Sequence, residues 1–571
     1  MDNEMEEYAG PVIQTQLFSR WQSFACVCLY VSVAGTTYAY GVYSSLLQEK
    51  LGFSQHGLDV VASVGNTGLY LSFVAGLALE RFGLQFVVCG GGLLIFIGFL
   101  YIWAAVEGLV PANITSVCVL FFFSQFGVCC HVSSSVTYCI RLFPQKLRGV
   151  SVGLAKGYFA LSSAVLGDFA GGYFAKSPAA FLLFIAIFIP VVGSTSSQFA
   201  NLLPASAVPL AKWEKATLMP FILHWILLFT ALASIGLLQF FWELPDYASS
   251  VSAFVLTCTL FSIQLLPRYY GPRIVSFSAA QVLMPEGSKY VLASGKERGT
   301  GGEEDPLLEK DKEGASSSSS ASSSASSASS SASTSAPTSS SSSGLLKNAC
   351  YYGESVPFSE AVLKWRFWAM YFVFMIQTGV GLMVIYNINA IAESVGKYPS
   401  TFFVTLVSLA NGLGRVLAGF ISDIAMAYVS KLELLSIVIL LMAATQALHS
   451  IGSPTLLYPC LLTVGFLFGC TVSLMAVNIA DIFGSLYIAT NFGAIDSAPI
   501  FGTVIFAAGI VYIFYSETTG DDESAENACY VDNCFRVPFL INSCACLVAF
   551  CVCRFVHSRT NTHERGSTGG H

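Results

Sequence analysis

The sequence predicts an all-α polytopic membrane protein with about 14 transmembrane helices. Hydrophobic residues make up 54% of the chain and charged residues only 11%, whereas roughly 25% charged residues are usual in soluble domains. The mean hydropathy is +0.66. The apolar residues also fall into repeated blocks of about 20, the length that a helix needs to cross a hydrocarbon core. A single membrane anchor is therefore excluded.

The apolar blocks form two sets of six spans that flank an extra pair. We expect the first six-helix bundle within residues 21–200, an extra transmembrane hairpin within 218–267, and the second six-helix bundle within 363–556. The individual spans are expected at 21–47, 58–79, 86–106, 114–138, 149–173, 179–199, 218–242, 249–267, 366–391, 402–423, 433–450, 456–480, 487–515 and 537–556.

Three polar segments complete the predicted organisation. Residues 1–20 and 557–571 form short tails, and residues 268–362 interrupt the apolar blocks. This interruption contains a serine/alanine run with too little apolar area to offset the entropy of ordering, so we expect a disordered loop. If the N-terminus is cytosolic, most lysine and arginine residues of the short loops lie on the cytosolic side. All three polar segments are then predicted to be cytosolic.

Both halves carry a glycine followed four residues later by a carboxylate, near the predicted cytosolic end of a span. Gly76 precedes Glu80 in the first half, and Gly419 precedes Asp423 in the second. Glycine allows helices to approach closely, and a carboxylate can accept hydrogen bonds from the N-terminus of a neighbouring helix. We therefore expect a conformational latch that holds the two bundles closed on the cytosolic side. Its residues are Gly76, Glu80, Arg81, Gly83, Gly419 and Asp423.

At these residues the sequence resembles the major facilitator superfamily, whose first-half loop motif is Gly-x-x-x-Asp-Arg-x-Gly followed by basic residues. Here glutamate replaces the aspartate at Glu80, and Leu84 and Gln85 stand where basic residues are usual. Other stretches resemble the nodulin-like branch of that superfamily, and the similarity covers nearly the whole chain. They are Arg20-Trp21, Tyr38-Ala39-Tyr40-Gly41, Arg148-Gly149 with Gly153-Leu154-Ala155-Lys156-Gly157, and Asn411-Gly412-Leu413-Gly414-Arg415.

The resemblance implies two major-facilitator bundles and a secondary transporter that moves a small polar organic solute by alternating access. Carriers of this broad kind in protists include vitamin carriers, so riboflavin is a first expectation. The alternatives are an organic-anion, monocarboxylate or amino-acid carrier, and a non-transporting membrane scaffold or receptor. We expect no enzyme and no cofactor, because the sequence contains neither a phosphate-binding loop nor a recognisable catalytic set. It has no long basic stripe for nucleic acid.

Ionisable residues within hydrocarbon are costly, so each is a candidate functional residue. Lys156 lies eight residues after Arg148 and hence about 12 Å deeper, although its side chain could also extend back toward the cytosol. Arg415 cannot lose its charge, and we expect its acceptors to come from another helix, from water or from the solute. For His131, a neutral core histidine is the competing interpretation. The candidate substrate-binding residues are Lys156, Arg415, His131, Asn387 and Asp496, and no metal site is expected.

Two further features lie in the predicted loops. Glu303, Leu307 and Leu308 form an acidic dileucine pattern of the kind that sorting adaptors bind, with chance occurrence as the alternative. Cys529 and Cys534 could form a disulfide if their loop faces an oxidising side, with two free thiols as the alternative. We expect a multi-pass protein of the plasma membrane, or of an endosomal or lysosomal/vacuolar membrane. Its expected partners are the solute, the lipid bilayer and a sorting adaptor.

Overall fold

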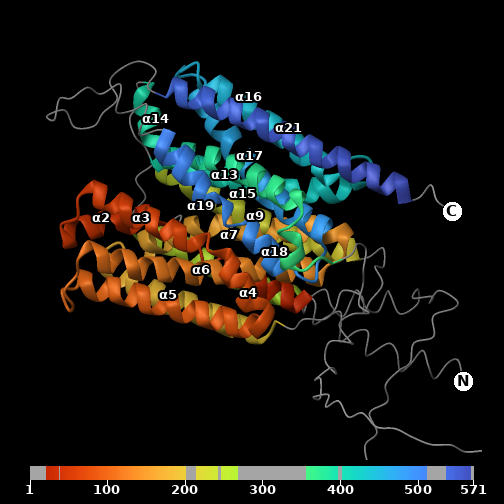
Figure 1. Cartoon of the computed structure of the whole chain (residues 1–571). Coiled ribbons are helices and arrows are strands. Elements are labelled where there is room, and N and C mark those ends of the chain that lie inside the picture. Colours follow the sequence, from red (N-terminus) through yellow and green to blue (C-terminus); the bar gives the residue numbers. More distant parts are fainter. Residues whose placement is uncertain are drawn as a thin grey trace, which may run out of the picture. The chain divides into compact units, whose positions relative to one another are not determined.

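The computed structural model describes residues 21–37, 39–200, 214–241, 246–267, 355–395, 401–510 and 535–567. Every regular element in these ranges is a helix, which confirms the predicted all-α class (Figure 1). By length and composition, eleven described helices could cross a membrane. They run over Val60–Phe82, Leu84–Val106, Ile114–Leu142, Gln145–Tyr173, Pro178–Gln198, Leu218–Ile235, Trp365–Tyr386, Lys431–His449, Leu457–Phe483, Ile488–Ala507 and Arg536–Arg559.

The other three predicted spans coincide with helices outside this set of eleven. Trp21–Val31 and Ser249–Leu265 are apolar but shorter. The third is α15 (Thr401–Ile424), which has 24 residues and carries both Arg415 and Asp423. The count of fourteen membrane spans therefore stays a prediction.

The first half begins with the helix Trp21–Val31 and continues with seven labelled helices. Asn113 starts α6 with a capping box, in which its side chain and that of Ser116 bond each other's backbone amides. Gly83, with φ of 83°, ends α4 and allows the chain to turn directly into α5. The helices are α2 (Tyr40–Leu51), α3 (Gln55–Leu69), α4 (Ser72–Phe82), α5 (Leu84–Val106), α6 (Ile114–Leu142), α7 (Gln145–Tyr173) and α8 (Pro178–Gln198).

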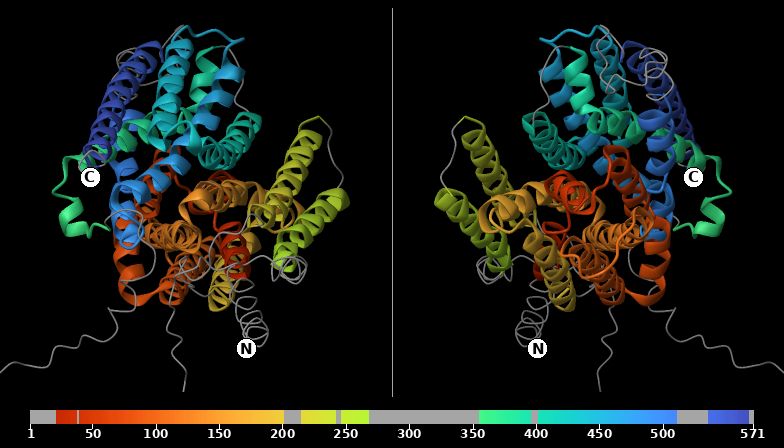
Figure 2. Two further views of the ribbon diagram at one scale, coloured as in Figure 1. Left: turned by 90° about the vertical axis from the view of Figure 1, so that its right-hand side faces the viewer. Right: turned by 90° about the vertical axis from the view of Figure 1, so that its left-hand side faces the viewer.

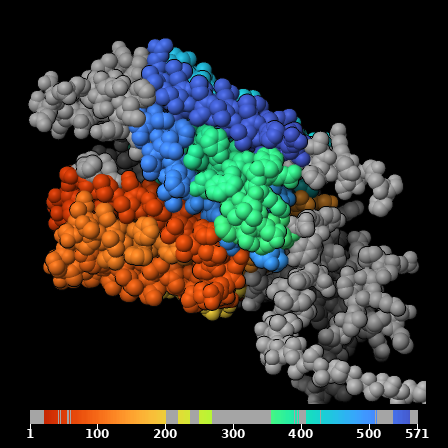
Figure 3. Space-filling view, viewed as in Figure 1, coloured from red at the N-terminus to blue at the C-terminus, as the bar shows by residue number. Residues whose placement is uncertain are grey.

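The second half packs against the first, as the green-to-blue and red-to-orange atoms in Figure 3 show. Its described part begins at residue 355, within the segment 268–362 that contains the predicted disordered loop. There the Val356 amide donates a hydrogen bond to the Phe483 carbonyl. Its last helix extends into the predicted C-terminal tail. Besides α15, the elements are α12 (Phe358–Ala361), α13 (Trp365–Tyr386), α14 (Ile388–Ser394), α16 (Lys431–His449), α17 (Leu457–Phe483), α18 (Ile488–Ile495), α19 (Ala498–Gly502), the π-helix η4 (Thr503–Ile510) and α21 (Arg536–Ser567).

Among the described residues, four spans that we predicted as continuous helices are interrupted. The first is broken between Val31 and Tyr40, the second between α3 and α4, the ninth at Asn387 between α13 and α14, and the thirteenth at Asp496, where α18 ends. In the first break, the hydroxyl groups of Thr36 and Thr37 both hydrogen-bond to the side chain of Gln125 on α6. Non-helical backbone at membrane depth is tolerated where protein surrounds it. In the first break, α6 provides part of this cover.

The extra hairpin consists of α9 (Glu214–Phe241) and α10 (Asp246–Ser262), which lie beside α7 (Figure 2, yellow-green). The His224 ring on α9 contacts the Tyr158 hydroxyl of α7 at 2.8 Å and the Thr259 carbonyl of α10 at 2.7 Å. Ser252 on α10 donates to the Asp168 carboxylate of α7 at 3.0 Å. Asp168 and His224 are thus used to attach the hairpin to the first half.

Candidate functional site

Two pairs of helices join the halves through glycine. On α15, a Cβ atom at Gly419 would clash with the backbone of Gly149 and Gly153 on α7. A Cβ atom at Gly76 on α4 would clash with the Ala489 carbonyl of α18. Each motif glycine thus lies where one half touches the other, and any side chain there would force the backbones apart.

Asp423 of the second half bonds to the first half next to this contact. Its two carboxylate oxygens accept hydrogen bonds from the amides of Gly149 at 3.1 Å and Val150 at 2.8 Å. The Lys431 ammonium lies 3.9 Å from one of these oxygens and 3.2 Å from the Asp481 carboxylate. This end of α15 is therefore connected to α7, α16 and α17 by charged groups.

Glu80 makes the corresponding connection from the first half to the second. Its carboxylate accepts a hydrogen bond from the Thr490 amide of α18 at 3.0 Å. Arg141 lies 4.0 Å from the same carboxylate oxygen and donates to the Leu486 carbonyl at 2.6 Å. Arg81 does not take part, since it is exposed and lies over the Phe82 ring. Four of the six predicted latch residues thus lie at the contacts between the halves, whereas Gly83 ends a helix.

Lys156, Arg415 and Asp496 come together between the halves, and we call them the charged cluster. Lys156 on α7 is 3% exposed, Arg415 on α15 is 2% exposed and Asp496 is 8% exposed. Lys156 Nζ donates to the Val472 carbonyl of α17 at 3.1 Å and lies 4.9 Å from the centre of the Phe492 ring. Its ammonium group therefore points into the second half rather than back toward the helix end.

Arg415 has acceptors on its own helix as well as on α7. Its Nε donates to Asn411 Oδ1 at 2.9 Å, and one Nη donates to the Lys156 carbonyl at 3.1 Å. The guanidinium also lies over the Phe159 ring, 5.8 Å from its centre. Our expectation that all its acceptors would lie off its own helix was wrong, because Asn411 is one helical turn away on the same face.

Asp496 connects the cluster to the break in the second span. Its carboxylate accepts a hydrogen bond from the Ser72 hydroxyl at 2.6 Å, and Ser72 begins α4. Cys129 Sγ on α6 lies 3.3 Å from the same hydroxyl. Asp496 also interacts electrostatically with Lys156 and with Arg415. The cluster is thus built from both halves, and its Asp496 connects two helix breaks.

The other predicted substrate-binding residues lie elsewhere. His131 Nδ1 contacts the Gly127 carbonyl at 2.9 Å, and its ring packs against Gly193 of α8 within the first half. Asn387 caps α13 and donates to the Met383 carbonyl of that helix. The sorting and disulfide predictions fall outside the described residues. They concern Glu303, Leu307, Leu308, Cys529 and Cys534.

Sequence reasoning missed the neutral partners of the cluster. Asn411 could have been found from its spacing of four residues from Arg415. Ser72 gave no signal, because a serine in an apolar span is ordinary and only the fold brings it to Asp496. The Val472 carbonyl has no signature in sequence at all. The charged residues of the cluster were thus predictable from their cost in hydrocarbon, whereas its neutral partners are determined by how the helices pack.

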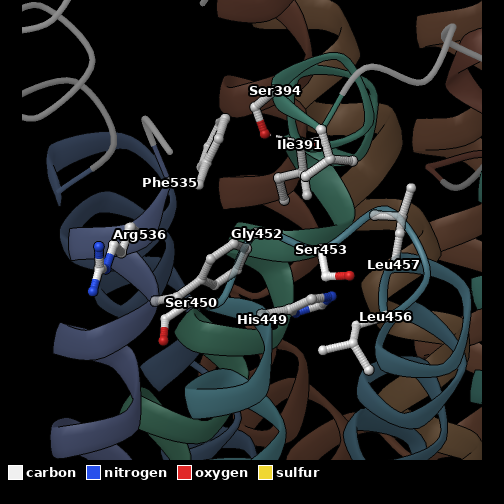
Figure 4. Close-up of a pocket in the computed structure, with 12 residues that line it drawn as sticks. Ile391, Ser394, His449, Ser450, Gly452, Ser453, Leu456, Leu457, Phe535 and Arg536 are labelled. Atoms are coloured by element: carbon white, nitrogen blue, oxygen red, sulfur yellow. Dashed lines mark hydrogen bonds between the residues drawn. The ribbon is translucent and has the colours of Figure 1, made fainter. Parts of the chain in front are cut away.

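A small pocket that no residue of the charged cluster lines lies within the second half (Figure 4). It is formed by the ends of α14, α16, α17 and α21. His449 lines it and stacks on Phe539, with 4.7 Å between ring centres. It has no cation–carboxylate pair among its lining residues and none of the predicted substrate-binding residues.

We expect Asp423→Asn to loosen the contact between the halves more than Glu80→Gln. Asparagine would turn an NH₂ group toward one of the two backbone amides that donate hydrogen bonds to Asp423. The amide left without an acceptor costs about 1–3 kcal/mol. Glutamine at 80 keeps an oxygen for the single Thr490 amide. Ser422, buried beside Gly149, provides a reporter through Ser422→Cys. A water-soluble maleimide should label it about fivefold faster with Asp423→Asn and less than about twofold faster with Glu80→Gln. Equal rates in both variants would contradict this assignment.

Comparisons with known proteins give the following relationships. Residues 20–267 match the Nodulin-like family model, and residues 354–564 match the model of the NFD4 C-terminal domain. The chain is 22% identical over 428 residues to the Arabidopsis thaliana protein NUCLEAR FUSION DEFECTIVE 4. This match covers 72% of the chain and 65% of that relative, slightly less than two thirds of the relative's own length.

Two solved structures are also similar. One is the major facilitator superfamily proton:xylose symporter XylE bound to 6-bromo-6-deoxy-D-glucose, with 12% identity, a TM-score of 0.51 and 94% of each chain covered. The other is the E. coli fucose:proton symporter FucP, with 10% identity and a TM-score of 0.48 over 94% of this chain and 98% of that one. At these identities the likeness to XylE concerns the fold alone.

Proposed function

We propose that this chain, whose residues 20–267 match the Nodulin-like family model and whose residues 354–564 match the NFD4 C-terminal domain model, is a secondary transporter that moves a small polar organic solute by alternating access. In such carriers the solute site lies near the membrane midplane between two repeats that rock against each other. The buried charged cluster between the two halves carries the proposal. Burying these ionisable residues within hydrocarbon is costly, and a role in binding the solute explains why they are present.

The depth of the cluster relative to the latch supports this function. Lys156 follows Gly149 by seven residues, and Arg415 precedes Asp423 by eight. By helix rise, the cluster therefore lies about 10–12 Å along α7 and α15 from the latch contacts. A solute at the cluster would be separated from the predicted cytosolic side by Asp423, Glu80 and the glycine contacts. Opening these contacts would release it, as alternating access requires.

Riboflavin is the vitamin that we first expected, and it enters the proposal as one member of the solute panel that tests it. Cells expressing the chain should take up at least one labelled solute faster than empty-vector cells. The panel contains monocarboxylates, dianionic phosphate esters, amino acids and uncharged solutes including riboflavin. A scaffold or receptor would give no uptake of any class at normal surface abundance, and that result would overturn the transporter proposal.

We propose a plasma-membrane location, with both termini and the central loop in the cytosol. The excess of lysine and arginine in the predicted cytosolic loops supports the orientation. Surface biotinylation and protease protection of terminal tags test the two statements. An internal location, or a terminal tag that is cleaved from outside intact cells, would contradict them.

A further inference from the structure

The ammonium group of Lys156 is buried, and its hydrogen-bond donors are only partly used. A lysine ammonium has three donors, and Lys156 uses one of them on the neutral carbonyl of Val472. The Phe492 ring gives it a second favourable contact. Among the described residues, no carboxylate forms an ion pair with Nζ. Within the described part of the chain, two donors of this buried cation therefore have no acceptor.

Two charged side chains act on the ammonium group of Lys156. Asp496 is the carboxylate, and Arg415 is the second cation. The Asp496 carboxylate also accepts a hydrogen bond from Ser72 and interacts with Arg415. The Asp496 charge is therefore not available to Lys156 alone.

Burying a charged group costs free energy unless an opposite charge or hydrogen bonds compensate it. A solute that brings a carboxylate would give the Lys156 ammonium a charged acceptor in addition to the neutral Val472 carbonyl. An uncharged solute would not. Lys156 also connects the two halves, since its helix belongs to the first half and its contacts, Val472 and Phe492, belong to the second.

We propose that the transported solute is a small organic monocarboxylate whose carboxylate group binds to Lys156. This inference rests on the proposed transport function and assigns a charge to its solute. The aromatic rings of Phe492 and Phe159, which lie beside the two cations, would contact the apolar part of such a solute. The Asp496 carboxylate, which also acts on Lys156, would repel a second negative charge on the solute.

The solute panel distinguishes this inference from the transport function on which it rests. Uptake of monocarboxylates that exceeds uptake of their amides by at least about tenfold is the expected result. Benzoate with benzamide and lactate with lactamide are suitable pairs. If the chain transports only uncharged or cationic solutes, the charge assignment is wrong and the transport function stands. If it transports nothing, the function itself fails.

Variants of Lys156 then test the residue. For a transported monocarboxylate, Lys156→Gln should raise KM at least about tenfold at unchanged surface abundance, and Lys156→Arg should raise it less because a cation remains. Asp168→Asn is the matched control, since Asp168 lies on the same helix but bonds to Ser252 of the hairpin. Its KM should stay at the wild-type value.

A second measurement needs no variant at all. In wild-type proteoliposomes, an excess of unlabelled acid should inhibit uptake of the labelled acid, and the matching amide should not. Equal inhibition by acid and amide would overturn the role of Lys156 even if Lys156→Gln fails to reach the membrane. An unchanged KM in a well-expressed Lys156→Gln protein would overturn it as well.

Discussion

Replacing Gly419 with alanine is expected to reduce uptake at least about tenfold, although only one methyl group is added. The new Cβ atom would clash with backbone atoms of Gly149 and Gly153, which cannot rotate away as a side chain would. Overpacking of this kind costs about 1–3 kcal/mol. The cost applies to the arrangement in which α15 and α7 touch, so the variant should populate arrangements in which this end is open.

Gly412→Ala is the matched control for this experiment. Gly412 lies on the same helix, two turns away, and a Cβ atom there would make ordinary contacts of 3.4–3.8 Å with Leu161, Ala160 and Trp225. Both changes raise helix propensity by the same amount. Uptake per surface molecule and maleimide labelling of Ser422→Cys should change for Gly419→Ala only. Equal effects of the two alanines would show that close approach at Gly419 is not needed for the transport cycle.

The sequence predicted the membrane fold because hydrocarbon thickness imposes one length on every span, and hydropathy detects that length. It did not predict the interruptions at residues 32–39 and at Asp496. Small residues such as Gly35 and Thr36 leave an apolar window nearly unchanged. What breaks the helix there is packing, since a Cβ atom at Gly35 would clash with Ser162 of α7, and Thr36 bonds to Gln125. Such tertiary contacts have no local signature.

The candidate site could be predicted in part for the same reason. A charge in hydrocarbon is costly whichever helix it faces, so Lys156, Arg415 and Asp496 were identifiable one by one. The sequence does not indicate that these three residues lie close together. Nor does it indicate that His131 is buried among the helices of the first half. That distinction depends on which face of α7 packs against α15 and α17, and the apolar residues on all faces of these helices hide it.

Arg415→Gln is expected to produce the largest loss of uptake, about 100-fold, and Arg415→Lys about tenfold. Each hydrogen bond from a charged group contributes about 1.5–3 kcal/mol, and Arg415 donates in two directions, to Asn411 and to the Lys156 carbonyl. Glutamine removes the charge and leaves acceptors unsatisfied. Lysine keeps the charge but lacks the planar fork that reaches both acceptors. Initial uptake and surface abundance must be measured together.

The two measurements separate recognition of the solute from simple stabilisation of the fold. Asn411→Ala removes one acceptor of Arg415 and leaves the guanidinium in place, so its loss of uptake should be smaller than that of either Arg415 variant. If Arg415 only holds α15 against α7, abundance should fall in proportion to uptake, and uptake per surface molecule should stay constant. If it orients the site that the solute enters, abundance should stay above about half of wild type while uptake per molecule falls. Normal uptake with normal abundance in both Arg415 variants would exclude any role of this residue in moving the solute.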